Sequence, residues 1–216
     1  MVDFSDQVGQ TAATYFDDML FSTGTQSLSD FYSEVTYGNV TLVTLNLPSS
    51  LGWIRAPQTA AYYVGNDQGS GPYPQNAQKM VEDAVDAADD IVDFSVYDND
   101  GPDGIPSSGD DDGVVDYLFV IHAGQGYEWT LNPDHIHSHV ANIPAREVDG
   151  VLVKAYATEP EDGRVGTYAH EMGHLLGLPD LYDATLSSFG LGAWSLMSYG
   201  SWGGNGSRPA GLDAWS

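Results

Sequence analysis

The chain has 216 residues, of which 31 are acidic and 6 are basic, for a formal net charge of -25. Its length fits one domain, which could have two lobes, and its hydrophobic content of 42% favours a folded protein. So negative a surface repels nucleic acid and anionic membranes, and no apolar run approaches the roughly 20 residues that span a bilayer. The absence of cysteine excludes thiolate metal ligands, a cysteine nucleophile and disulfide bonds.

In the first half of the chain, apolar periodicity predicts short helices and one strand. Residues 11–21 favour a short helix, and a second helical turn is expected over residues 29–35 with Ser29 as its cap. Residues 43–47 alternate between apolar and polar side chains, which predicts a half-buried strand. The clearest early helix is predicted over residues 76–92. One face of that helix is apolar, and the other carries a run of charges that we interpret as a solvated face.

Two strands are predicted between residues 117 and 157. Residues 117–121 are all apolar, as in a buried central strand, and residues 151–157 alternate as in another strand. The edge of such a strand can pair through its backbone with an extended peptide, and we assign that role to residues 151–157. The order of elements predicts a mixed α/β layered domain.

The stretch from His170 to Asp180 carries the clearest chemical signal. Its pattern, HExxHxxGxxD, places His170 and His174 one helical turn apart on one face, so both imidazoles can reach one metal ion. Glu171 lies beside them and can take a proton from a metal-bound water. Gly177 can end the helix in the left-handed conformation, after which Asp180 can supply a third, anionic ligand. Three protein ligands and a water are typical of a catalytic zinc site.

Other interpretations of this stretch are weaker. A surface helix with two histidines by chance leaves the glycine and the aspartate of the motif unexplained. Asp183 could compete with Asp180 as the third ligand, but the spacing from His170 favours Asp180. No serine nucleophile elbow or phosphate-binding glycine loop is present. A catalytic carboxylate pair stays open in so acidic a chain, although nothing singles out a pair.

Several stretches resemble the immune inhibitor A-type family of secreted bacterial metallopeptidases. The specific ones are HEMGHLLGLPDLYD at residues 170–183 and GAWSLMSYGSWGG at residues 192–204, with shorter matches at residues 2–6, 31–38 and 116–124. The resemblance implies a secreted zinc endopeptidase of metzincin-like architecture that is released from a prodomain. It also implies that His170, His174 and Asp180 bind the zinc and that Glu171 is the base. Compared with the family, a strand before residue 2 and C-terminal modules are missing, so we expect residues 1–216 to be a single catalytic domain trimmed at both ends.

Residues 195–199 resemble the Met-turn of metzincins, in which a methionine forms an apolar floor under the zinc. Met197 would be that residue, and the alternative is an ordinary buried methionine that fills an irregular gap. Tyr199 stands where some metzincins place a phenol that contacts the metal or the developing oxyanion. Many members of the resembled family lack a tyrosine there, and a packed aromatic with a satisfied hydroxyl is the alternative.

Two acidic stretches, residues 98–104 and 110–116, are similar to calcium loops. Calcium takes roughly six to eight oxygen ligands, which acidic residues at alternate positions around a glycine can supply. Neither stretch has the bidentate glutamate of an EF-hand, and a solvated acidic turn is the alternative. We predict at least one Ca²⁺ that clamps the loop onto the following strand. Its expected ligands are Asp98, Asp100, Asp110, Asp112 and Asp116.

The remaining histidines have weaker assignments. His135, His137 and His139 would face one side of a strand, where they could form a second metal site. A polar edge or loop with at most one functional histidine is the stronger interpretation. His122 ends an apolar strand and is expected to be a hydrogen-bonded core residue, with a place near the cleft as the alternative.

The expected fold is an α/β, metzincin-like catalytic domain with a mixed twisted sheet packed with helices and an active-site helix followed by the Met-turn. The expected activity is hydrolysis of peptide bonds in proteins through a zinc-bound water, with Glu171 as general base. We expect a secreted, extracellular monomer that uses Zn²⁺ and Ca²⁺ and binds neither nucleic acid nor membranes. The alternatives are a calcium-stabilised binding module with an inert zinc site, and a zinc hydrolase that acts on another amide.

Overall fold

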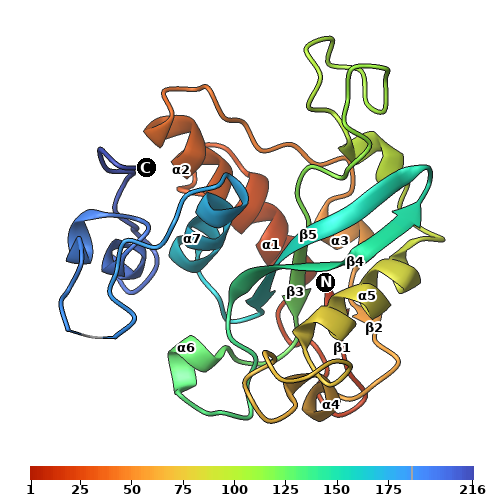
Figure 1. Ribbon diagram of the computed structural model, residues 1–216, viewed down its shortest axis with the longest axis horizontal. Helices are drawn as coiled ribbons and strands as arrows, with labels where there is room; N and C mark the ends of the chain where they lie inside the picture. The colour runs from red at the N-terminus through yellow and green to blue at the C-terminus, as the bar shows by residue number, and fades with distance from the viewer. Residues whose placement is uncertain (186) are drawn as a thin grey trace. The chain divides into compact units, whose positions relative to one another are not determined.

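A computed structural model describes residues 1–185 and 187–216 and divides them into two compact units (Figure 1). The first unit comprises residues 1–10 and 51–162 and carries the β-sheet. The second comprises residues 11–50 and 163–216 and carries the HExxHxxGxxD motif. The short helix α3 (Pro48–Leu51) spans the boundary between them in the sequence. None of the helices in the described part of the chain has the length and apolar character that a membrane span requires.

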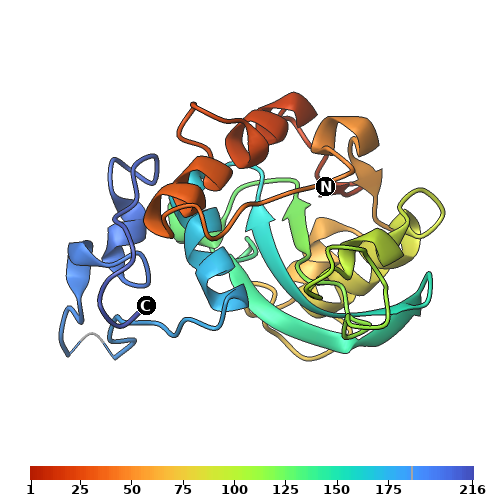
Figure 2. The same cartoon turned by 90° about the horizontal axis from the view of Figure 1, so that it is seen from above.

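The sheet of the first unit has five strands in the order β2-β1-β3-β5-β4. Neighbours among β2 (Ile54–Arg55), β1 (Val2–Asp3), β3 (Phe119–His122) and β5 (Val151–Pro160) are parallel, while β4 (His139–Val148) runs antiparallel to β5. The views in Figures 1 and 2 show the long strands β4 and β5 curving side by side. The mixed α/β class and the strands predicted near residues 117–121 and 151–157 are therefore confirmed.

The prediction that residues 151–157 form a substrate-binding edge is wrong. These residues belong to β5, which lies between β3 and β4. On one side Leu152 bridges to Val114 and Ala157 pairs with Phe119 of β3, and on the other side the residues pair with β4. The outer strand on this side is β4, which joins β5 through Asp149 and Gly150. Both turn residues have positive φ, 50° and 84°, as a type I′ hairpin turn requires. An Asp-Gly pair between two apolar runs is the signal that could have predicted this hairpin.

Helix α5 (Ala77–Ala88) packs on the sheet with contacts to both β2 and β4 (Figure 1). It begins after Asn76, whose side chain accepts a hydrogen bond from the N–H of Lys79 at 3.0 Å. The part of its apolar face within the helix is buried as predicted and contributes Ala77, Met80, Val81 and Val85 to the core. The helix ends at Ala88 rather than at the predicted residue 92, and Ile91 beyond it is 53% exposed.

The charged face of α5 is only partly solvated, which corrects the prediction for this helix. Glu82 and Asp83 are only 4% and 9% exposed. Lys79 Nζ lies 2.6 Å from one Asp83 oxygen, and the Tyr63 hydroxyl donates to the other at 2.6 Å. Because buried carboxylates are tolerated only when they have such partners, the burial of Asp83 depends in part on Tyr63 from another helix, which periodicity cannot identify. The other short elements of this unit are α4 (Ala60–Val64), η1 (Phe94–Tyr97) and α6 (Tyr127–Thr130).

The second unit contains α1 (Ala13–Phe21), α2 (Leu28–Val35) and α7 (Val165–Leu175), followed by the 3-10 helices η2 (Gly192–Trp194) and η3 (Tyr199–Trp202). Helix α2 packs against both α1 and α7 (Figure 2). The Tyr32 hydroxyl donates to the carbonyl of Ala169 at 2.6 Å and so ties α2 to α7. The helices predicted near residues 11–21 and 29–35 are confirmed. The cap of α2 is Ser27 rather than Ser29, because the Ser27 Oγ accepts the N–H of Asp30 at 3.0 Å.

Residues 43–47 form no strand, which contradicts the prediction made from their alternation. Val43 and Leu45 are 74% and 67% exposed, whereas Thr44 and Asn46 between them are half-buried. In the described part of the chain the segment pairs with no neighbouring strand, and Asn46 N–H bonds locally to Thr44 Oγ1 at 3.3 Å. Periodicity therefore matched the alternation in exposure but could not reveal the missing partner, on which a strand depends.

His122, at the end of β3, is the buried core histidine that the sequence predicts. It is 2% exposed, and its Nδ1 lies 3.1 Å from the carbonyl of Ala123. Burial lowers the pKa of His122 to about 4. The neutral imidazole is therefore the form that the folded chain accommodates.

This burial makes the stability of the chain dependent on pH. Because the pKa of His122 is lower in the folded chain than its ordinary value, protonation favours unfolding: the contribution is intact above about pH 6.5 and is lost as the pH falls towards 4. As the pH falls from 6.5 to 4, we expect the free energy of unfolding of the wild type to fall by about 3 kcal/mol more than that of His122→Asn. Urea denaturation of both proteins at several pH values, with a metal chelator present, measures this. Parallel pH profiles for the two proteins would contradict it.

Candidate metal centre

Helix α7 ends in a Schellman motif that turns the chain back towards its own last turn. The N–H of Leu178 donates to the carbonyl of Gly173 at 2.9 Å, and the N–H of Gly177 donates to the carbonyl of His174 at 2.9 Å. Gly177 has a φ of 88°, a conformation in which a side chain would be strained. The predicted role of Gly177 as the end of the helix is therefore confirmed.

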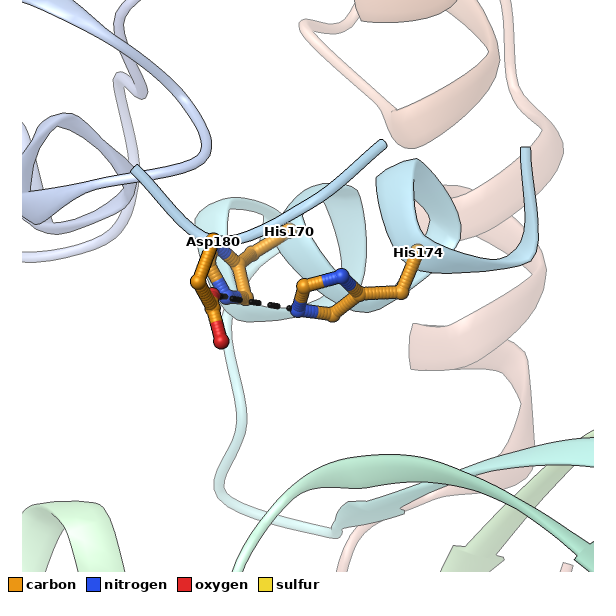
Figure 3. A group of neighbouring side chains, drawn as sticks. All are labelled: His170, His174 and Asp180. Atoms are coloured by element: carbon orange, nitrogen blue, oxygen red, sulfur yellow. Dashed lines mark ion pairs between the residues drawn. The ribbon is translucent and has the colours of Figure 1, made fainter. Parts of the chain in front are cut away.

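Because the chain turns back here, Asp180 lies next to His170 and His174 of α7 (Figure 3). Nε2 of His170 and Nε2 of His174 lie 3.2 and 3.3 Å from the same Asp180 oxygen, Oδ1, and the two rings are nearly perpendicular at 86°. In tetrahedral zinc sites, metal–ligand bonds of about 2.0–2.1 Å place neighbouring ligand atoms about 3.3–3.4 Å apart. The observed spacing fits that geometry.

Backbone carbonyls fix the orientation of both imidazoles. Nδ1 of His170 lies 3.0 Å from the carbonyl of Leu196, and Nδ1 of His174 lies 2.8 Å from the carbonyl of Leu178. A carbonyl can only accept, so each Nδ1 carries a proton, and a neutral ring then offers the lone pair of Nε2 to a metal. The Leu178 carbonyl is itself positioned by the Schellman motif, so the turn that brings back Asp180 also orients His174.

The three side chains change one another's pKa values. Burial lowers the pKa of His170, but the interaction with Asp180 and the charge of Glu171 outweigh it and raise the pKa. The Asp180 carboxylate is the main cause of the raised pKa of His174. Burial opposes ionisation of Asp180, yet the two histidines hold its pKa well below the usual range. The site therefore favours an anionic Asp180 and attracts positive charge.

Glu171 lies on α7 beside the first histidine and is buried. Its negative charge raises the pKa of both His170 and His174. A buried carboxylate next to a candidate ligand in the sequence is a candidate proton acceptor for a water in the centre.

Met197 packs against α7 at the turn of the helix that carries the ligands. It is fully buried, and a Cβ added to Gly173 would lie 2.5 Å from the Met197 Sδ. The N–H of Leu181 donates to the Met197 carbonyl at 2.7 Å, which ties the segment after Asp180 to the segment before Tyr199. The helix therefore needs glycine at position 173 so that the thioether can approach.

Tyr182, which the sequence analysis did not single out, is the aromatic residue that stacks on a candidate ligand. Its ring lies 6.3 Å from the His170 ring at an interplanar angle of 30°. Tyr199 lies 6.1 Å from Tyr182. Asp183 belongs to a local turn, where its carboxylate accepts the N–H groups of Thr185 and Ser188 at 2.8 and 2.9 Å. The only available sequence signal for Tyr182 was its place two residues after Asp180.

In the first unit, carboxylates gather in the acidic loop. Asp98, Asp100 and Asp111 offer oxygen atoms within 4.8 Å of one another. Asp98 is 2% exposed, and its Oδ1 has no hydrogen-bond partner among the described residues. Such a buried, unpartnered carboxylate oxygen is costly without a cation. Asp111, absent from the predicted ligands, belongs to the group.

The other predicted calcium ligands lie close by but are not in that group. Burial and the charges of Asp100, Asp98 and Asp112 raise the pKa of Asp116, so these four carboxylates repel one another. Asp110 instead receives a short hydrogen bond from the Ser108 hydroxyl. The alternation of acidic residues therefore identified the loop. It did not identify which of the three consecutive aspartates 110–112 lies near Asp98 and Asp100.

The three alternating histidines are engaged in other contacts. His137 stacks on His139 with 4.5 Å between ring centroids, and His139 Nε2 lies 3.0 Å from the Tyr156 hydroxyl. His135 Nδ1 lies 2.8 Å from Thr130 Oγ1. Within residues 1–185 and 187–216, they do not converge as a group that could hold a metal. These contacts agree with the interpretation of residues 135–139 as a polar edge or loop.

Comparison with known proteins identifies the family. Residues 9–216 match the model described as immune inhibitor A peptidase M6, catalytic domain. The chain belongs to this family. The resemblance seen in the sequence is confirmed, and so is the expectation of a metallopeptidase.

Two relatives illustrate the similarity. The pre-pro-metalloprotease PrtV of Vibrio cholerae serotype O1 is 33% identical over 237 residues, which cover 94% of this chain and 25% of PrtV. Immune inhibitor A of Bacillus thuringiensis subsp. alesti is 33% identical over 204 residues, which cover 83% of this chain and 29% of that protein. The chain thus spans between a quarter and a third of the length of these relatives.

The contact between Gly173 and Met197 can be tested by substitution. Alanine normally stabilises a helix interior by about 0.5–1 kcal/mol relative to glycine. Here we expect Gly173→Ala to lower the free energy of unfolding by about 1–3 kcal/mol, because its Cβ overlaps the Met197 sulfur. In a Met197→Ala background the same change should cost nothing. A double-mutant cycle by urea denaturation measures the coupling, and additive effects would contradict the contact.

Proposed function

We propose that this domain hydrolyses peptide bonds in proteins with a zinc ion held by His170, His174 and Asp180. The observation that carries the proposal is the spacing of 3.2 and 3.3 Å between the two Nε2 atoms and Asp180 Oδ1. A zinc ion there would lower the pKa of a bound water to about 7 and polarise the scissile carbonyl. Three protein ligands leave a fourth position for that water.

Glu171 is the proposed general base. It is buried and its charge acts on both histidines, which supports a role in which it accepts the proton of the attacking water and passes it to the leaving amine nitrogen. Asp180 makes the centre less positive than a site of three neutral histidines would be. A less positive centre acidifies its water less, so the reaction depends more on Glu171 as the proton acceptor.

Met197 is proposed as the floor of a metzincin-like Met-turn. Its fully buried side chain against Gly173 and the bond from His170 Nδ1 to the carbonyl of the preceding residue, Leu196, support this role. For Tyr199, contact with the metal or with the developing oxyanion stays a prediction.

A calcium ion in the acidic loop is part of the proposal. Asp98, Asp100 and Asp111 supply its first oxygen ligands, and the charges of Asp112 and Asp116 add to the attraction. The buried Oδ1 of Asp98 supports a bound cation more strongly than the surface acidity of the loop does. The ion would hold the loop together and take no part in the reaction.

We further propose that the domain acts outside the cell as a monomer and is made as part of a precursor with a prodomain. The Vibrio relative is named a pre-pro-metalloprotease, and this chain covers 25% of it, which supports a longer precursor.

The central test compares the wild type with Glu171→Gln and His174→Ala. We expect Glu171→Gln to keep one zinc per chain and to lose about 10²–10⁴-fold in turnover, because only the proton acceptor is removed. His174→Ala should lose both zinc and activity. Zinc is measured by atomic emission, and activity by cleavage of fluorescently labelled, denatured casein. Wild-type turnover in Glu171→Gln would exclude the mechanism, and zinc without casein cleavage in the wild type would favour the binding-module alternative.

The calcium proposal predicts a stability effect that depends on Asp98. With zinc held constant, saturating calcium should raise the Tm by several degrees, since a hundredfold excess over the Kd adds about 2.7 kcal/mol and each 1 kcal/mol shifts the Tm by about 2–4 °C at this length. Asp98→Asn should abolish that shift. Asp90→Asn, at an exposed position, is the matched control and should keep it. Equal calcium-induced shifts in all three proteins, or none in the wild type, would refute the site.

A further inference from the structure

A long stretch without charged side chains follows the candidate ligands. Charged residues make up 17% of the chain, yet residues 184–207 contain none. The part of the stretch around Met197 is buried, which accounts for the absence of charge there. Burial does not account for Phe189 and Trp194, which are 81% and 87% exposed. Two large apolar rings are therefore left in water by a segment that carries no charge.

Phe189 and Trp194 belong to one compact turn, residues 189–194, which we call the aromatic turn. The N–H of Gly192 donates to the carbonyl of Phe189 at 2.8 Å, and the N–H of Trp194 donates to the carbonyl of Leu191 at 3.3 Å. The two rings are therefore carried by the same short segment and are not scattered singly over the surface. Exposed apolar groups that gather in this way mark binding sites, whereas single exposed residues do not.

The aromatic turn is anchored beside the candidate metal centre. The N–H of Leu191 donates at 3.0 Å to the carbonyl of Leu181, the residue that follows the third candidate ligand. Gly190 packs on the next residue, because a Cβ added to it would lie 2.8 Å from the Tyr182 Cα. The ring of Tyr182 stacks on the ring of His170, with 6.3 Å between the centroids. A chain of contacts therefore joins the aromatic turn to a candidate zinc ligand.

We propose that Phe189 and Trp194 are substrate-contact residues that bind apolar and aromatic side chains of an unfolded polypeptide. This inference rests on the proposed function and names its substrate class. An extended polypeptide whose scissile bond lies at the centre advances about 3.3 Å per residue, so the 6.3 Å between the rings of His170 and Tyr182 corresponds to about two residues. Side chains a few residues from the scissile bond therefore reach the aromatic turn.

The chemistry of the turn selects the occupant. Aromatic rings gain most by burying other apolar groups, and residues 184–207 offer no charged side chain to pair with a charged substrate. Apolar side chains are mostly buried in folded proteins and become accessible when a chain unfolds. A second copy of this chain is a poorer occupant, because each copy carries a net charge of -25. The favoured occupant is an unfolded chain that is rich in apolar residues.

Two quenched-fluorescent peptides of equal length and net charge test the preference. One places phenylalanine and leucine on both sides of a common central bond, and the other places serine and asparagine there. We expect the wild type to cleave the apolar peptide with a kcat/KM at least about tenfold higher. Phe189→Ala and Trp194→Ala should each lower kcat/KM for the apolar peptide about three- to tenfold, through KM, and change that for the polar peptide less than about twofold.

A binding measurement separates contact from turnover. In the Glu171→Gln background, the fluorescence anisotropy of the labelled apolar peptide should show a Kd that Trp194→Ala raises by the same factor. Tyr37→Ala is the matched control and should leave KM and Kd unchanged, because it removes a ring that is 95% exposed and lies outside the aromatic turn. Thermal unfolding and zinc content check that each variant keeps its fold and its metal.

An unchanged KM and Kd for the apolar peptide in the variant that combines Phe189→Ala with Trp194→Ala would overturn the inference and leave the zinc site standing. Equal losses with both peptides would also overturn it, since they would indicate a loosened turn. A change in self-association by sedimentation, with a wild-type Kd for the peptide, would assign the surface to contact between copies instead. A wild type that cleaves neither peptide would overturn the proposed function first and this inference with it.

Discussion

The reversal of the chain after α7 is the constraint on which the candidate centre depends. A helix can place two histidines on one face, but it cannot supply a third ligand on the same side of the metal from its next residues. The Schellman motif at Gly177 ends the helix and directs the chain back, so that Asp180 reaches both Nε2 atoms. The same turn aims the Leu178 carbonyl at His174. One backbone conformation thus sets a ligand position and the tautomer of another ligand.

The segment that follows Asp180 supplies further contacts to the candidate centre. Leu196 orients His170, Met197 packs on Gly173, and Leu181 is bonded to the Met197 carbonyl. Because these bonds join residues far apart in sequence, the segment around Met197 and the candidate third ligand form one connected structure. Positive charge is favoured at the candidate centre, with its anionic Asp180 and buried Glu171, and at the acidic loop, with its buried Asp98. The net charge of -25 makes bound cations favourable at both.

The sequence predicted the helix, the Gly177 turn and the convergence of the two histidines with Asp180, because these are local consequences of helical spacing and of glycine's conformational freedom. It failed where the outcome depends on partners distant in the chain. Residues 43–47 lack a neighbouring strand, residues 151–157 lie in a strand between β3 and β4, and Asp83 became buried against the Tyr63 hydroxyl. The choice of Asp111 over Asp110, and the stacking of Tyr182 on His170, are likewise set by how irregular loops fold, which no periodicity encodes.

X-ray absorption at the zinc edge, on the domain loaded with one zinc ion per chain, tests the proposed ligand set most directly. The account predicts four nitrogen or oxygen neighbours at about 2.0–2.1 Å, with the multiple-scattering signal of two imidazoles. It also predicts that Asp180→Asn changes the first shell while Asp183→Asn leaves it unchanged. A spectrum with one or three imidazoles, or a shell altered by Asp183→Asn and not by Asp180→Asn, would contradict the assignment of His170, His174 and Asp180.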